Sequence, residues 1–137
     1  MAIPNGGGGY QIGDGNLNEP LIDALPDPVA VTTAATLTAA QVLNGLILAN
    51  SGITASVNYT LPTVADLELT LSNSDKVGTS FTFRLVNLGT SSGTAVIVTN
   101  TGWTITGSLT MTIPVTTGAF FIARKSGAGA WTLYRAA

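Results

Sequence analysis

Residues 119–135 read AFFIARKSGAGAWTLYR, and this stretch decides the fold that we expect. Two runs rich in aromatic and aliphatic residues flank a small, glycine-containing segment between Lys125 and Gly129. Apolar runs around a glycine-containing turn are typical of a β-hairpin. Side chains alternate across a strand, so Trp131 and Tyr134 should point to opposite faces of the sheet. The stretch therefore predicts that the last two strands form a hairpin.

Similar short runs precede this hairpin, and glycine-containing turns separate most of them. They read, in chain order, GLILAN, ASVNYTLP, SFTFRLVN, TAVIVTN, WTITG and SLTMTIPV. In SFTFRLVN the alternation puts Phe81, Phe83 and Leu85 on one face. Many short strands at close spacing predict an all-β fold, an antiparallel β-sandwich or barrel of the jelly-roll kind. Pro114 cannot donate to a sheet ladder, so we expect it at an edge or a bulge.

One or two short helices are predicted within this β-rich chain. Thr38 and Gln41 have the spacing of a capping box, and Gly45 follows where that helix should stop. A second helix start is predicted at Thr63, with Asp66 three residues later. The residues after Thr63 fit two patterns, because Leu67, Leu69 and Leu71 also alternate as a strand would. We favour a helix, since Pro62 followed by Thr63 is typical of a helix start.

The first 29 residues differ in composition from the rest of the chain. They are rich in glycine, and they hold four of the six prolines and four acidic residues but no basic one. Glycine makes ordering costly in entropy, and proline favours extended backbone. We therefore expect residues 1–29 to be an extended arm and residues 30–137 to be one domain.

The composition excludes several classes of function. The chain has no Cys and no His, which rules out disulfides, thiol nucleophiles and imidazole bases. Only 9% of its residues are charged, against about 25% in an average soluble domain. A protein surface with so few charges is poorly protected against association, so we expect much of this protein's surface to be buried in an assembly. All seven acidic residues precede all five basic ones, yet the few scattered bases do not predict nucleic-acid binding.

Three motifs resemble functional sites but lack residues that those sites require. The glycines in NGGGGYQIGDGN lack the spacing of a dinucleotide fingerprint and the GK[ST] of a phosphate loop. The series Asp14, Asn16, Asn18 begins like a calcium loop, but Glu19 stands where glycine is required. GTSSG, residues 89–93, has no histidine to activate a serine, and it reads as a turn between strands. We predict no enzyme activity, no cofactor, no metal, no small-molecule substrate and no membrane span.

The succession ATLTAAQVLNGLILA, NYTLPTVADLE, DKVGTSFTFRLVN, TGWTITGSLTMTIP and FIARKSGAGAWTLYR resembles a small β-rich domain of virion proteins from tailed bacteriophages, cyanophages among them. The resemblance covers roughly residues 35–135 and is most specific in TGWTITGS and GAGAWTLYR. It implies a capsid decoration (cement) protein, usually a homotrimer, that binds the major capsid protein. The alternative is a head or tail fibre component that attaches to the host surface. Either protein would be made in the host cytoplasm and would reside on the virion.

Two sets of contact residues follow from this interpretation. In the arm, the apolar side chains expected to contact the capsid protein or another partner are Tyr10, Ile12, Leu17 and Leu21. In the domain, the aromatic residues that could lie at a subunit interface are Trp103, Phe121, Trp131 and Tyr134.

Overall fold

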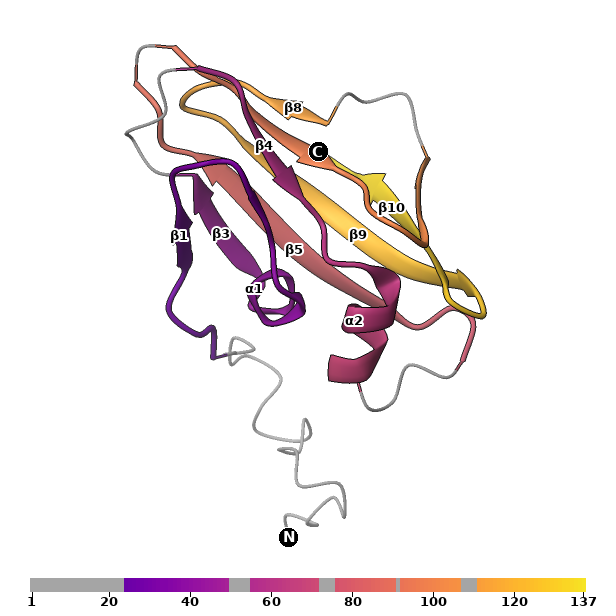
Figure 1. Cartoon of the computed structure of the whole chain (residues 1–137). Helices are drawn as coiled ribbons and strands as arrows, with labels where there is room; N and C mark the ends of the chain where they lie inside the picture. Colours follow the sequence, from indigo (N-terminus) through magenta and orange to yellow (C-terminus); the bar gives the residue numbers. More distant parts are fainter. Residues whose placement is uncertain (1–23, 50–54, 72–75, 91, 107–110) are drawn as a thin grey trace, which may run out of the picture.

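The computed structural model of the chain describes residues 24–49, 55–71, 76–90, 92–106 and 111–137 (Figure 1). Within these residues the helices are α1 (Ala39–Leu43) and α2 (Val64–Thr70). The strands are, in chain order, β1 (Val29–Val31), β2 (Ala35–Thr36), β3 (Leu46–Ala49), β4 (Val57–Thr60), β5 (Ser80–Asn87), β6 (Ala95–Val98), β7 (Trp103–Thr106), β8 (Thr112–Ile113), β9 (Gly118–Gly127) and β10 (Ala130–Arg135).

The strands form two mixed sheets. The six-stranded sheet has the order β1-β3-β5-β9-β10-β7, and the four-stranded sheet has the order β2-β4-β6-β8. From β1 to β6 the chain alternates between the sheets, so that β1, β3 and β5 pair in parallel, as do β2, β4 and β6. The strand-rich fold with two short helices is confirmed.

The predicted hairpin is also confirmed, because β9 and β10 are antiparallel neighbours. The antiparallel arrangement predicted for the whole fold is wrong, since five of the eight strand pairs among the described residues are parallel. Parallel neighbours need a long crossover between them. Here the chain forms a strand of the other sheet between two paired parallel strands, and this segment is the crossover. No local pattern in the sequence indicates that arrangement.

The two sheets share one hydrophobic core. On β5 and β9 the inward side chains include Phe83 and Phe121, whose rings stack with centroids 5.0 Å apart. The four-stranded sheet contributes residues such as Tyr59 and Ile97 to the same cluster. Pro114 directly follows β8, which lies at an edge of the four-stranded sheet, as predicted. The alternation read from the sequence thus separates inward from outward residues correctly on the long strands.

Both predicted helix starts are present. Thr38 accepts a hydrogen bond from the Gln41 backbone N–H, and the Gln41 side chain accepts one from the Thr38 N–H. At α2, the Thr63 hydroxyl accepts from the Asp66 N–H and donates to the Asp66 carboxylate. Each helix buries one face in the core, and Figure 1 shows both helices at the same end of the domain.

Asn87 ties the end of β5 to the opposite sheet. Its side chain is fully buried, donates to the carbonyl oxygens of Ile113 and Gly93, and accepts from the Gly89 N–H. Asn87→Ala removes these three hydrogen bonds inside the core, so we expect the free energy of unfolding to fall by about 2–3 kcal/mol. Urea denaturation followed by tryptophan fluorescence measures the loss.

The matched control for this prediction is Asn58→Ala, because Asn58 is an exposed asparagine in the middle of β4. We expect that control to change the free energy of unfolding by no more than about 0.5 kcal/mol. Equal losses in the two variants would contradict a role for the Asn87 hydrogen bonds.

Candidate interaction surface

A largely buried ion pair connects α2 with the C-terminal hairpin. The Lys125 Nζ lies 2.5 Å from the Glu68 Oε1, and the two side chains are 7% and 26% exposed. The indole N–H of Trp131 donates to the same carboxylate oxygen over 3.1 Å. The hydrogen bond from Lys125, followed by that from Trp131, lowers the pKa of Glu68 below its usual value. Because these groups satisfy one another, the cluster holds α2 against the sheet.

The other acidic side chain of α2, Asp66, has a local role. Asp66 is engaged with Thr63 at the start of α2. Within the described ranges, no group of three acidic side chains gathers where it could hold a metal ion. Asp14, Asn16 and Asn18, the residues of the rejected calcium motif, lie outside the described residues.

A groove of about 500 Å³ lies between the first turn of α1 and one side of α2. It is lined by Thr36, Leu37, Thr38, Ala39, Ala40, Pro62, Thr63, Asp66, Leu69, Thr70 and Asn100. Among the described residues that line it, Asp66 is the ionisable one, and its carboxylate accepts a hydrogen bond from the Thr63 hydroxyl.

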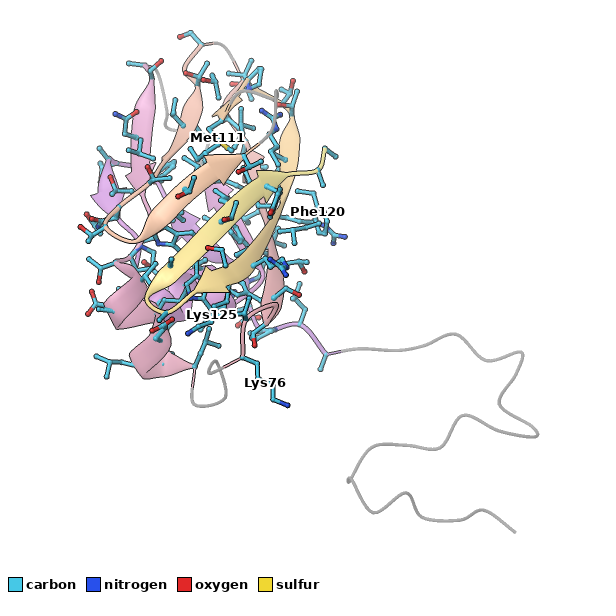
Figure 2. All side chains as sticks on the ribbon, turned by 90° about the vertical axis from the view of Figure 1, so that its right-hand side faces the viewer. Lys76, Met111, Phe120 and Lys125 are labelled. Carbon is cyan, nitrogen blue, oxygen red and sulfur yellow. The ribbon has the colours of Figure 1, made fainter. Side chains whose placement is uncertain are left out.

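The outward side of the six-stranded sheet carries apolar side chains. The register places Leu46 beside Arg84 and Arg84 beside Phe120, so these three share one face. We call this side the outer face; its half-buried apolar residues are Leu46, Leu48, Val86, Phe120, Ile122 and Tyr134. Figure 2 shows Phe120 pointing away from the body of the domain. An apolar sheet face of this extent is suited to being covered by another part of a protein.

The first described residues lie at the rim of the outer face. A cavity of about 370 Å³ is bounded by Ala24, Leu25 and Pro26 together with Arg84 and Phe120, among other residues. The Asn44 side chain donates to the Asp27 carbonyl oxygen over 2.9 Å. The chain is thus held against the domain at Asp27.

Strand β7 forms an edge of the six-stranded sheet and pairs in parallel with β10 on its other side. It consists of Trp103, Thr104, Ile105 and Thr106, with no charged residue and no proline. Its last three residues are exposed, and Ile105 is 39% exposed although its register partner Leu133 is fully buried. A sheet edge formed by an uncharged strand with an exposed apolar side chain is suited to the addition of a partner strand.

The other sheet edges are shorter or better protected. Strands β2 and β8 have two residues each, and the guanidinium of Arg135 donates to the Thr112 carbonyl oxygen on β8. On β1, the Tyr59 hydroxyl donates to the Val31 carbonyl oxygen. Short length and bound carbonyl groups disfavour strand addition. Among the described edges, β7 is therefore the best candidate for pairing with another chain.

The predicted contact residues have different outcomes. Tyr10, Ile12, Leu17 and Leu21 lie outside the described residues. Phe121 and Trp131 are fully buried and Trp103 is 8% exposed, all within the chain's own core. These three side chains hold the sheets together and offer almost no surface to a second subunit. Tyr134 is half-buried on the outer face, so its interface role stays a prediction.

Sequence reasoning missed the two features that matter most here. The outer face was hidden because its residues alternate with core residues that are equally apolar, as in Phe120 and Phe121 of β9. The edge position of β7 depends on its pairing with β10, almost 30 residues later. The absence of charge in WTIT was the one available signal.

Comparison of this chain with protein-family models, with curated proteins and with solved structures found no match. In the part of the chain that the structure describes, no helix is both long enough and apolar enough to cross a membrane.

Proposed function

We propose that this chain is a capsid decoration protein, which binds the major capsid protein of a tailed phage as a homotrimer and stabilises the head. The observation that carries the proposal is the uncharged strand β7, which forms an edge of the six-stranded sheet among the described strands. Strand addition at this edge would give main-chain hydrogen bonds to a capsid strand, and Ile105 would supply an apolar contact beside them. The resemblance of residues 35–135 to phage virion domains supports the same conclusion.

The N-terminal arm gives a second contact in this proposal. Its glycine-rich first half, with Tyr10 and Ile12, can lie close to a capsid backbone, because glycine permits close approach. Three such arms in a trimer would combine weak contacts through their effective concentration. A β-sandwich over residues 30–137 behind an arm of residues 1–29 is part of the proposal, and the jelly-roll connectivity stays a prediction.

The proposal assigns the protein a structural role on the virion surface, without a catalytic residue or a cofactor. Copy number separates it from the fibre alternative. A decoration protein should be present in hundreds of copies per virion, whereas a fibre component should be present in a handful. Quantitative mass spectrometry of purified virions makes this distinction.

Replacing Ile105 by lysine tests the β7 edge. A lysine on an edge strand opposes strand addition, so we expect Ile105→Lys to weaken binding to capsids about tenfold or more. The measurement is co-sedimentation of the purified protein with phage capsids from which it has been removed. Ile105 is 39% exposed, so the stability of the domain should change little.

The matched control is Leu69→Lys, because Leu69 is 85% exposed on α2 and lies on a different surface. It adds the same charge and should leave capsid binding unchanged. If the native protein fails to bind capsids, or if Ile105→Lys binds as tightly as Leu69→Lys, the proposal that β7 contacts the capsid is wrong.

A further inference from the structure

The outer face of the six-stranded sheet lacks a cover among the described residues. Leu48 and Val86 are neighbours in register, and so are Ile122 and Tyr134. All four are half-buried by their neighbours within the sheet. These apolar side chains extend from β3 to β10, and covering them would be favourable by the hydrophobic effect.

The charges of the outer face are all of one sign. Arg84 and Arg124 are exposed on β5 and β9, and neither has an ion-pair partner among the described residues. The Arg84 guanidinium lies over the Phe120 ring, 5.1 Å from its centroid. A second copy of the same face would bring arginines against arginines, which is unfavourable. The face instead matches a segment that is both apolar and acidic.

The seven residues before the described chain have that chemistry. They read LNEPLID, residues 17–23, with Leu17, Glu19, Leu21 and Asp23 at alternate positions. In an extended segment these four side chains share one side, and Pro20 favours extended backbone. Leu25 continues the same alternation at the rim of the outer face, close to Gly45 and in one cavity with Arg84 and Phe120.

The length of the segment fits the distance that it would have to cross. Seven extended residues span about 23 Å, at roughly 3.3 Å per residue. From β5 the strands β9, β10 and β7 follow at intervals of about 4.8 Å, so the far edge is within reach. Because Ala24 and Leu25 line the cavity at the rim and Asp27 is bound to Asn44, the same chain's segment has a higher effective concentration there than any other partner.

We propose that residues 17–23 bind across the outer face of their own sheet as a strap. Leu17 and Leu21 cover the apolar side chains, and Glu19 and Asp23 pair with Arg84 and Arg124. The strap goes beyond the proposed capsid function: it assigns Leu17 and Leu21, which the sequence analysis expected to contact the capsid protein or another partner, to the chain's own sheet. It leaves Tyr10 and Ile12 free to contact a partner.

Disulfide trapping in the full chain tests the strap, because the native sequence contains no cysteine. In the variant Leu21→Cys with Ile122→Cys, the second cysteine replaces a half-buried residue at the centre of the outer face. We expect mild oxidation to close an intrachain disulfide, at least about tenfold faster than in the control. The control is Leu21→Cys with Asn58→Cys, whose second position is exposed on the opposite sheet. Intact mass and thiol counts after oxidation report the product.

Charge reversal provides an independent readout. Arg84→Glu with Arg124→Glu, added to the trapping pair, should slow disulfide formation by several-fold. Glu19→Arg with Asp23→Arg should restore the rate in that background. Trapping no faster than in the control would overturn the strap, as would a disulfide that joins two chains. Both assays use purified protein without capsids, so failure of the strap and failure of capsid binding are separate results.

Discussion

Gly102→Ala is expected to lower the free energy of unfolding by about 3 kcal/mol or more, among the largest effects that we predict for a single methyl group. Gly102 has a φ of +90°, in the left-handed region that disfavours residues with a side chain. A Cβ there would lie 2.6 Å from the Val64 Cβ and 2.9 Å from the Gly129 carbonyl oxygen. Neither atom belongs to the end of a flexible side chain, so the backbone itself would have to move.

The position of Gly102 makes such a movement costly. Its carbonyl oxygen accepts a hydrogen bond from the Trp131 N–H, and β7 begins at the next residue. Trp103 is fixed in turn by its indole N–H, which donates to the Pro62 carbonyl oxygen over 2.8 Å. Displacing residue 102 would therefore disturb the edge strand, α2 and the hairpin together. Urea denaturation, followed by the fluorescence of the two tryptophans, measures the change.

Gly78→Ala is the matched control, since Gly78 has nearly the same φ, +95°. The nearest atom to its added Cβ is the end of the flexible Arg124 side chain, at 3.6 Å. We expect this variant to lose only the conformational cost, about 1–2 kcal/mol. If the two variants lost the same stability, close packing around Gly102 would contribute nothing.

The local elements of this fold could be predicted from sequence because their signals lie within a few residues. Thr38 and Gln41 form the capping box that their spacing indicates, and Thr63 begins α2 as expected. The alternation in SFTFRLVN correctly placed Phe83 and Leu85 in the core. Each of these features depends on hydrogen bonds or side-chain directions within one or two turns of chain.

The pairing of the strands could not be predicted in the same way. Strand β7 follows β6 in sequence, yet it pairs with β10 in the other sheet. Turn residues report only that the chain reverses, and they carry no information about which sheet receives the next strand. Short strands separated by turns therefore favoured an antiparallel prediction, which is wrong for most of the described strand pairs.

Only some roles of the acidic side chains can be predicted from neighbouring residues in the sequence. Asp66 and Glu68 lie two residues apart on α2, and the structure gives them separate roles. Asp66 acts locally at the start of α2, and this role is readable from Thr63 three residues earlier. Glu68 pairs with Lys125, which is 57 positions away in the sequence. Only the three-dimensional packing of α2 against the hairpin brings that pair together.

Glu68→Leu should also be strongly destabilising, by about 3 kcal/mol, because it leaves a buried ammonium without its partner. The Lys125 side chain is only 7% exposed, and the Trp131 indole N–H would lose its acceptor as well.

Two further variants test this cause. Glu68→Gln keeps an oxygen for both donors, so we expect the free energy of unfolding to fall by only about 1–2 kcal/mol. The double variant Glu68→Leu with Lys125→Met removes both charges and should regain most of the loss. If it is no more stable than Glu68→Leu, the unpaired ammonium is not the cause.

The ion pair also predicts how stability depends on pH. The hydrogen bonds from Lys125 and Trp131 lower the pKa of Glu68 in the folded protein, so the unfolded chain binds this proton more readily. The contribution of Glu68 is therefore fully present above its unfolded pKa, about 4.3, and is lost as the pH falls through its lower folded pKa.

Urea denaturation at pH 7 and pH 3 measures this effect. The free energy of unfolding should fall less on acidification in Glu68→Gln than in the native protein. Asp66→Asn is the comparison, because Asp66 acts on the same helix without the buried lysine. An equal acid-induced loss in the native protein and in Glu68→Gln would mean that Glu68 does not contribute to acid sensitivity.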